Sequence, residues 1–318
     1  MIKKVLVIRF SSIGDIVLTT PVLRCLKKQM PGIEIHYLSK SNYQVVLENN
    51  PYIDKIHYLD QHPIFKAAAL KNGNYDLVID LHHNLRTTLF KAVLGIKAYS
   101  FNKLNWQKFL AVFFKIKQLP NIHIVDRYLA TLNSLLVTND GLGLDYFIPE
   151  KDAHFPDGHQ NLAQEKYVAW AIGGQHFTKR LPAKKVIELA AGVKHKIVLL
   201  GGKEDQEAAQ KIANSLGSKC INLVGLLNLN ESAFVVQNAQ VLYTNDTGLL
   251  HIGAALKKPI ISFWGNTIPA FGMGPYYGNA PIPYQIIENN HLSCRPCSKI
   301  GFNKCPKGHF ACMENLSL

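Results

Sequence analysis

The sequence lacks long apolar runs, since no stretch approaches the roughly 18 apolar residues that a membrane-spanning helix requires. We also expect no signal peptide, because the apolar run 5–8 is too short for one and Arg9 follows it at once. Short-period repeats and low-complexity tracts are missing as well, which argues against a solenoid. We therefore expect a globular protein of the cytoplasm.

Cysteine is scarce over most of the chain, where Cys25 and Cys220 stand alone. Four further cysteines and a histidine gather near the C-terminus: Cys294, Cys297, Cys305, His309 and Cys312. A cytoplasmic location disfavours disulfides between them. The four cysteines suit a tetrahedral zinc site, but the second pair is spread too widely for a CxxC motif, so reduced thiols stay as the alternative.

Positive charge prevails, because 35 Lys and Arg against 22 Asp and Glu leave a formal net charge of +13. Both halves of the chain carry a share of it. A diffuse basic surface favours anionic partners such as nucleotides or acidic lipid, with ordinary solubility as the alternative. Nucleic acid is disfavoured as a partner, since the basic residues are dispersed and no reading helix is evident.

Apolar runs of strand length alternate with segments of helical periodicity, which is typical of parallel sheets built from βαβ units. The predicted strands are 5–10, 34–38, 55–59 and 77–81 in the first half, and 167–172, 197–200, 220–224, 241–244 and 260–263 in the second. Between the two series, the polar passage 147–158 with its Pro and Gly residues is typical of a linker. The sequence thus predicts an α/β protein with two Rossmann-like domains, residues 1–158 and 159–318.

The loop after the first predicted strand carries a carboxylate where nucleotide-binding folds place a glycine-rich phosphate cradle. It contains Ser11, Ser12, Gly14 and Asp15 and no GxGxxG motif, which argues against a nicotinamide dehydrogenase. Asp15 would repel a diphosphate, but it is suited to take a proton from an attacking hydroxyl. We therefore assign this loop to the acceptor side of a transfer reaction. A simple helix cap is the alternative role of Asp15.

Loops after strands of the second half suit a nucleotide diphosphate. In the loop 173–182, Gly174 permits close approach, and Lys179 with Arg180 can neutralise phosphate oxygens. After another strand, Gly202 and Glu204 form a turn in which the acid can accept hydrogen bonds from ribose hydroxyls. A glycine turn with solvated cations and a capping acid are the respective alternatives.

The loop 244–251 is the most informative of the strand ends. Asp246 or Thr247 would cap a helix whose free amides, near Gly248, face a diphosphate. His251 lies four residues after Thr247 and therefore on the same helix face. The alternative is an ordinary N-cap followed by a histidine that faces the core.

Aromatic and basic residues are interleaved over residues 101–117, which include Trp106. This composition is typical of an amphipathic helix at a membrane surface. A core helix with one lysine-rich face is the alternative.

Taken together, these loops resemble glycosyltransferase family 9, the ADP-heptose:lipopolysaccharide heptosyltransferase family. The resemblance covers nearly the whole chain and rests on RFSSIGD (9–15), TKRLP (178–182) and TNDTGLLH (244–251). Each motif is weak alone, but their order and spacing are specific. The resemblance implies a GT-B fold, in which two Rossmann-like domains have parallel sheets facing a central cleft. It also implies inverting sugar transfer with no required metal or other cofactor.

The resemblance implies that Asp15 is the general base and that Lys179 contacts the phosphates of the leaving group. The loop Asp246–Gly248 would surround the donor sugar and diphosphate, with Glu204 at the ribose. The other donor-side residues predicted are Gly174, Thr178, Arg180, Gly202 and His251. The implied donor is ADP-heptose, and the implied acceptor is a lipid A/core oligosaccharide. For such an acceptor, the basic surface and the Trp106 segment would hold the enzyme peripherally on the inner face of the inner membrane.

Three features bear on this resemblance. The Cys-rich tail looks like one seen in many members, so its cysteines need not mean zinc. Only six residues follow Cys312, which predicts that the C-terminal helix that often crosses back to the first domain is short or missing. The loop 265–270 begins Gly-Asn-Thr instead of the Gly-Pro-Thr common in the family, so the donor sugar could differ from heptose. The alternatives are another GT-B enzyme acting on a nucleotide sugar, such as an epimerase, and a basic zinc-bearing nucleic-acid binder.

Overall fold

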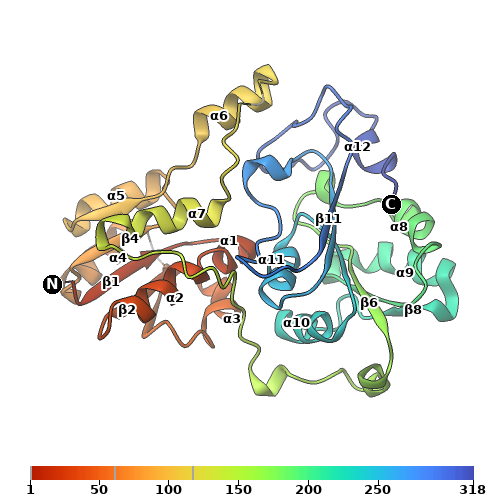
Figure 1. Cartoon of the computed structure of the whole chain (residues 1–318), viewed down its shortest axis with the longest axis horizontal. Helices are drawn as coiled ribbons and strands as arrows, with labels where there is room; N and C mark the ends of the chain where they lie inside the picture. The colour runs from red at the N-terminus through yellow and green to blue at the C-terminus, as the bar shows by residue number, and fades with distance from the viewer. Residues whose placement is uncertain (1, 61, 117) are drawn as a thin grey trace. The chain divides into compact units, whose positions relative to one another are not determined.

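The structure, a computed structural model, describes residues 2–60, 62–116 and 118–318 and divides into two compact units (Figure 1). Unit 1 comprises Met1–Lys103, Ile122–Phe147 and Gly278–Ala280. Unit 2 comprises Leu104–Asn121, Ile148–Tyr277 and Pro281–Leu318. The passage from Phe147 to Ile148 lies at the start of the predicted linker, whereas the segment Leu104–Asn121 packs with unit 2 although it precedes that linker in sequence.

Unit 1 contains a five-stranded parallel sheet in the order β3-β2-β1-β4-β5. Its strands are β1 (Lys4–Ile8), β2 (Glu34–Ser39), β3 (Lys55–Tyr58), β4 (Leu77–Asp80) and β5 (Ala98–Ser100). The four strands predicted here are confirmed to within two residues at each end. The sequence missed β5, because its three half-buried residues form no apolar run.

The helices of unit 1 pack on this sheet. They are α1 (Ile13–Val17), α2 (Thr20–Gln29), α3 (Gln44–Leu47), α4 (Pro63–Leu70), α5 (Leu85–Leu94) and α7 (Ile124–Leu129). The helical pattern after the Asp15 loop is divided between two helices, α1 and α2. Pro21 lies in the first turn of α2, and the Thr19 hydroxyl donates a hydrogen bond to the Ile16 carbonyl near the end of α1. Leu6 and Ile8 of β1 belong to a buried apolar cluster that also contains residues of the adjacent helices α4 and α5.

Unit 2 contains a six-stranded parallel sheet in the order β11-β10-β9-β6-β7-β8. Its strands are β6 (Tyr167–Ala171), β7 (Lys196–Leu200), β8 (Cys220–Asn222), β9 (Leu242–Asn245), β10 (Ile260–Trp264) and β11 (Tyr284–Glu288). The five strands predicted in this half are confirmed to within two residues at each end. The sequence missed the edge strand β11. Its first residues, Tyr284 and Gln285, are exposed, and only a short apolar run follows them.

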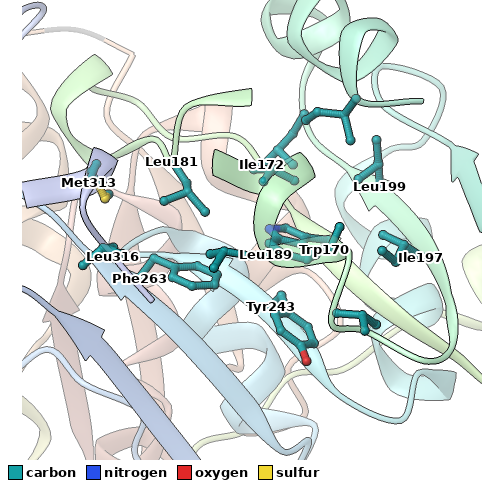
Figure 2. Close-up of a cluster of buried hydrophobic side chains, with 14 of the residues drawn as sticks. Trp170, Ile172, Leu181, Leu189, Ile197, Leu199, Tyr243, Phe263, Met313 and Leu316 are labelled. Atoms are coloured by element: carbon teal, nitrogen blue, oxygen red, sulfur yellow. The ribbon is translucent and has the colours of Figure 1, made fainter. Parts of the chain in front are cut away.

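The helices of unit 2 are α6 (Asn105–Phe109), α8 (Ala183–Ala190), α9 (Gln206–Leu216), α10 (Leu229–Asn238), α11 (Gly248–Ala255) and α12 (Ala311–Glu314). One face of the sheet carries a large apolar cluster, in which the rings of Tyr243 and Phe263 stack against Trp170 (Figure 2). Met313 and Leu316 join this cluster, so the C-terminal residues belong to the core of unit 2. No helix of the described residues is long and apolar enough to cross a membrane.

Both sheets have the doubly wound order in which the strand sequence reverses beside the first strand of the unit. The reversal lies between β1 and β4 in unit 1 and between β6 and β9 in unit 2. In open parallel sheets, ligands bind at the carboxyl ends of the strands at this point. The predicted α/β class is confirmed, and the Asp15, Lys179 and Asp246 loops all follow strands that flank a reversal.

Candidate functional site

Two loops of unit 2 that were predicted to bind the donor meet in an ion pair. Lys179 Nζ lies 2.6 Å from Asp246 Oδ2, although 67 residues separate them in sequence. The Thr267 hydroxyl donates to the same carboxylate oxygen at 2.9 Å. Asp246 is the more deeply buried partner, with 9% of its side chain exposed against 18% for Lys179. The ammonium group is therefore held at the carboxyl edge of the sheet and keeps access to solvent.

Asn245, the last residue of β9, fixes the loop that carries Lys179. Its amide nitrogen donates to the carbonyls of Ile172 and Gly173, both at 3.0 Å, and its oxygen accepts from the Leu181 amide at 3.2 Å. Because the Asn245 side chain is buried, these three hydrogen bonds tie both ends of the loop to the central strand.

Arg180 and Asp205 join two predicted loops. Arg180 Nε donates to the Gly174 carbonyl at 2.5 Å, and its Nη1 lies 3.3 Å from Asp205 Oδ1. Asp205 also accepts from the Gly202 amide at 3.0 Å. Burial raises the pKa of Asp205, against the opposing effects of this amide and of Arg180. Glu204, the acid predicted to bind ribose, is exposed beside Gly202.

Thr178 and His251 are both buried. The Thr178 hydroxyl accepts from the Phe302 amide at 2.8 Å and lies 3.2 Å from the Phe302 carbonyl, so it anchors the loop to the C-terminal segment. His251 is 2% exposed and lies among the buried residues of α11. Ligand contacts by these two residues stay predictions.

Thr247 occupies the N-cap position of α11, one of the two positions predicted. Within the described part of the chain its side chain makes no capping hydrogen bond, and its hydroxyl lies 3.3 Å from that of Thr244. Asp246 does not cap the helix either, since its carboxylate is engaged by Lys179 and Thr267. The first amides of α11, beginning at Gly248, thus lack a side-chain cap at the carboxyl end of β9.

Asp15 in unit 1 is paired with a buried cation from the same loop. Its Oδ1 lies 2.7 Å from Arg9 Nη2, and its Oδ2 accepts from the Ser12 amide and hydroxyl at 3.2 and 2.8 Å. The Asp15 side chain is 22% exposed, against 9% for Arg9. Asp15 therefore caps the start of α1 and also keeps a carboxylate open to solvent, while Ser11 and Gly14 complete the turn.

Arg9 is fixed from several directions. Its Nη1 donates to the Leu81 carbonyl at 2.6 Å and to the Tyr128 hydroxyl at 2.9 Å, and its Nε donates to the Ser11 carbonyl at 2.7 Å. Burial alone would lower the pKa of Arg9, but the charge of Asp15, the hydroxyl groups of Tyr128 and Tyr37 and the hydrogen bond to Asp15 together outweigh it, and the pKa is raised. Arg9 consequently stays charged and holds Asp15 in one place.

The loop after β4 adds His82 to this region. Burial, with the charges of Arg9 and Lys103, lowers the pKa of His82 to about 4, so the imidazole is neutral at physiological pH. Its ring packs on Phe10 with centroids 4.9 Å apart. The preceding Asp80, which is fully buried, accepts from the amides of His82 and His83 and fixes the loop.

A cavity of about 390 Å³ opens at the carboxyl end of β5 in unit 1. Arg127 contributes a guanidinium group to its wall, and most of the other side chains there are small or polar. The complete lining is Tyr99, Ser100, Phe101, Asn102, Arg127, Ala130, Thr131, Asn133 and Ser134. Such a wall suits an anionic, hydroxyl-rich ligand.

The cysteine-rich segment forms part of unit 2, and all six cysteines of the chain are free thiols. Cys294 Sγ lies 3.9 Å from His309 Nε2. Burial raises the pKa of Cys297 to about 11 and that of Cys312 to about 12, which keeps these thiols protonated. Among residues 2–60, 62–116 and 118–318, no three or more His, Cys, Asp or Glu side chains are grouped to hold a metal ion.

The aromatic segment forms α6 and a following π-helical turn, Leu110–Phe114. Ala111 packs against Ile268 and Phe271, whereas Trp106 and Phe113 are each 67% exposed. Lys115 is exposed, and its ammonium donates to the carbonyls of Val112, Cys294 and Pro296. The outer surface of the segment is thus apolar rather than evenly basic; Lys117, the last residue of the predicted stretch, lies outside the described residues.

Several residues of the site were missed in the sequence. Arg9 and Asp205 belong to motifs already singled out, so their charge was a usable signal. Asn245 and Arg295 donate to backbone carbonyls far away in sequence, and Thr267 donates to the carboxylate of Asp246. No local pattern reports such contacts.

Two doubly wound parallel sheets, one in each unit, define an α/β protein of GT-B fold, the fold of the E. coli heptosyltransferase structures that the chain matches. The family model described as "Glycosyltransferase family 9 (heptosyltransferase)" matches residues 66–304. The chain belongs to this family.

Individual relatives agree with that assignment. Lipopolysaccharide heptosyltransferase 1 of Campylobacter coli is 26% identical over 309 residues, which cover 87% of this chain and 86% of the relative. A glycosyltransferase family 9 structure from Veillonella parvula is 26% identical with a TM-score of 0.71, covering 89% and 86% of the two chains. The structure of E. coli heptosyltransferase WaaC with ADP-2-deoxy-2-fluoro heptose is 22% identical with a TM-score of 0.65, covering 89% and 92%, and shares the fold.

Proposed function

We propose that this enzyme transfers heptose from ADP-heptose to a lipopolysaccharide core acceptor, with inversion at the anomeric carbon. The observation that carries this proposal is the solvent-accessible Lys179 ammonium, held beside the uncapped start of α11 at the strand reversal of unit 2. Cations and helix amides together suit a diphosphate. The donor is proposed from the named activity of the relatives and from the ADP-heptose analogue bound to WaaC.

Asp15 is proposed to act as the general base of a single displacement. The acceptor hydroxyl gives its proton to Asp15 while its oxygen forms the new bond to the anomeric carbon. The bond from that carbon to the diphosphate oxygen breaks, and the electron pair leaves with the diphosphate. Because attack and departure occur on opposite faces, the anomeric configuration inverts. The 22% exposure of Asp15 supports access for a hydroxyl, and Arg9 would fix its orientation.

Lys179 is proposed to stabilise the negative charge that grows on the leaving diphosphate. The amides at Thr247 and Gly248 would assist it. In the unliganded chain Lys179 is paired with Asp246, so a bound diphosphate would take over the ammonium. Asp246 would keep its bond from Thr267 and become available to the donor sugar. Arg180 and Gly174 would shape this loop, with Gly202 and Glu204 on the nucleoside side.

The acceptor is proposed to bind unit 1. The cavity beside Arg127 offers one guanidinium group among hydroxyl and amide side chains, which matches an acidic sugar of a lipopolysaccharide core. Ser11, Ser12 and Gly14 would line the approach to Asp15. No metal is needed for this mechanism, since Lys179 supplies the positive charge; we expect turnover to survive treatment with EDTA.

The experiment that tests the proposed function supplies candidate sugar donors with a lipopolysaccharide precursor and identifies the nucleotide that is released. We expect ADP from ADP-heptose, and release only when the precursor is present. UDP or GDP sugars serve as alternative donors, and their use would replace the proposed donor within the same mechanism. Release of nucleotide without transfer to any acceptor, or isomerisation of the sugar, would contradict the proposal in favour of an epimerase.

We also propose that the exposed apolar side chains of the α6 segment contact the membrane that holds the acceptor. Trp106, Phe113 and Phe114 are all more than 60% exposed. We expect Trp106→Glu to reduce co-sedimentation with vesicles that contain anionic lipid, because a charge replaces an aromatic ring at the interface. Leu226→Glu, at another exposed apolar position, is the matched control. Sedimentation that ignores both Trp106→Glu and salt would refute membrane contact by this segment.

A further inference from the structure

Asn266, in the loop after β10, is a buried amide without hydrogen bonds. Its side chain is 1% exposed, and among the described residues neither Nδ2 nor Oδ1 has a hydrogen-bond partner. Most buried polar side chains are paired, because an unpaired group loses its bonds to water and gains nothing in return. An amide with both ends unpaired therefore needs an explanation.

The backbone at Asn266 and on both sides of it is held by hydrogen bonds from the cysteine-rich segment. Arg295, itself 2% exposed, donates to the Gly265 carbonyl at 2.5 Å and to the Thr267 carbonyl at 3.0 Å. The Cys297 amide donates to the carbonyl of Asn266 itself at 2.9 Å. Three consecutive carbonyls are thus bound by the cysteine-rich segment, which gives that segment a role independent of metal.

This loop is continuous with the donor-side ion pair. Thr267, the next residue, donates to Asp246, and Asp246 pairs with Lys179. A diphosphate that takes over Lys179 would free Asp246 from its ion pair, while Asp246 keeps its bond from Thr267 beside Asn266. The donor sugar is attached to that diphosphate, so it is the part of the ligand that arrives at this loop.

We propose that Asn266 is a specificity-determining residue that hydrogen-bonds hydroxyl groups of the donor sugar, an inference that rests on the proposed function. A carboxamide offers two N–H donors and a carbonyl acceptor, and neighbouring sugar hydroxyls each donate and accept, so the two groups satisfy each other. The sugar hydroxyls then supply the hydrogen-bond partners that the Asn266 side chain lacks. A sugar that lacks hydroxyls at this place leaves the amide of Asn266 unpaired, so the enzyme discriminates against it.

The test compares binding of ADP, which has no donor sugar, with binding and turnover of the ADP-sugar. For Asn266→Ala we expect kcat/KM for the ADP-sugar to fall by about 10- to 100-fold. The Kd for ADP should change less than about twofold, and the melting temperature should hold or rise, because an unpaired amide has been removed. Asn266→Asp, which replaces the N–H donors by an acceptor, should show the same split between sugar and nucleotide.

The matched control is Asn230→Ala, since Asn230 is equally buried in unit 2 but its amide donates to Asp152 at 2.8 Å. Asn230→Ala should lower the melting temperature, and any effect on the ADP-sugar should be matched by an equal effect on the binding of ADP. The inference is overturned if Asn266→Ala behaves like this control, or if it weakens ADP and ADP-sugar equally. Failure of the wild-type protein to bind ADP would instead contradict the proposed function, so the two failures are distinguishable.

Discussion

The two units use the same strand order but arrange their ion pairs in opposite senses. In unit 1 the buried partner is a cation, Arg9, and the more exposed partner is the carboxylate of Asp15. In unit 2 the buried partner is an acid, Asp246, and the more exposed partner is the ammonium of Lys179. The N···O distances are nearly equal, at 2.7 and 2.6 Å. One topology thus presents a base in one unit and a cation in the other.

From this difference we infer that the charge of the buried partner determines which charge lies exposed to solvent in each unit. The guanidinium group of Arg9 is fixed by hydrogen bonds to carbonyl and hydroxyl acceptors, and the carboxylate of Asp246 is fixed by a hydrogen bond from the Thr267 hydroxyl. Each buried charge needs its counter-charge, because an unpaired charge in a protein interior is costly. The exposed partner, Asp15 or Lys179, is held by its ion pair with the buried charge. Changes to either member should therefore have different effects in the two units.

The largest effect is expected from Asp15→Asn. The amide keeps the shape of the side chain but cannot take a proton, so kcat should fall by about 100- to 10,000-fold. Affinity for ADP should stay close to that of the wild type, because the nucleotide is assigned to unit 2. Isothermal titration and a transfer assay on the same preparation measure both quantities.

Asp157→Asn is the control for this substitution, since Asp157 is an exposed acid away from the strand ends. It should leave kcat unchanged. Loss of ADP affinity together with kcat in Asp15→Asn would mean that the helix-capping bonds to Ser12 are the main role of Asp15.

Lys179→Met should come next, with kcat reduced by about 100-fold, as for loss of one preorganised charge-stabilising group. ADP should also bind more weakly, in contrast to Asp15→Asn. The substitution leaves Asp246 buried without its cation, so stability should fall as well. Adding Asp246→Asn should restore the melting temperature but not the ADP affinity, which separates structural from ligand-binding effects. Lys211→Met, in an exposed pair with Glu207, is the control and should change neither.

Arg9→Lys should have a smaller effect, about tenfold on kcat. Lysine keeps the charge beside Asp15 but cannot reproduce the fork that reaches Leu81, Tyr128 and Ser11 together. The carboxylate would remain ionised and become less well oriented. Steady-state kinetics with saturating donor test this, and an unchanged kcat would show that Ser12 alone suffices to orient Asp15.

The smallest effect is expected in the pH dependence of stability. His82 has an ordinary pKa of 6.5, and burial first, then Arg9 and Lys103, lower its pKa in the folded chain to about 4. Between these values the unfolded chain binds more protons, so the free energy of unfolding falls as the pH drops from 6.5 toward 4. His82→Gln should remove about 1 kcal/mol of this fall, a figure reduced for the partial exposure of the ring.

Unit 2 offers the opposite sign for comparison. Burial raises the pKa of Asp205, so its protonation on acidification favours the folded chain. Asp205→Asn removes this compensation and should steepen the loss of stability in acid. Urea denaturation at several pH values measures both variants. Equal slopes for wild type and His82→Gln would contradict the assignment of the acid sensitivity to His82.

Sequence patterns located the strand ends but not the contacts made there. In the turn after β7 the sequence predicted Glu204 as the ribose-binding acid; the structure leaves Glu204 exposed, and this role stays a prediction. The structure also buries the neighbouring Asp205 beside Arg180, a contact that the sequence did not predict. Both residues are acidic and adjacent, so composition cannot distinguish them. The direction of each side chain depends on the turn and on what packs over it.

The amino-acid sequence was sufficient to predict the α/β class, the two series of strands and the family, and to select Asp15 and Lys179 as candidate groups. These follow from local periodicity and from motifs whose members are near in sequence. The folded chain was needed to see that Asp246 pairs with Lys179, that Arg295 binds the carbonyls around Asn266, and that the aromatic segment packs with unit 2. Such contacts join residues far apart in the chain, and their energies depend on burial and on hydrogen-bond geometry that exist only once the sheets have formed.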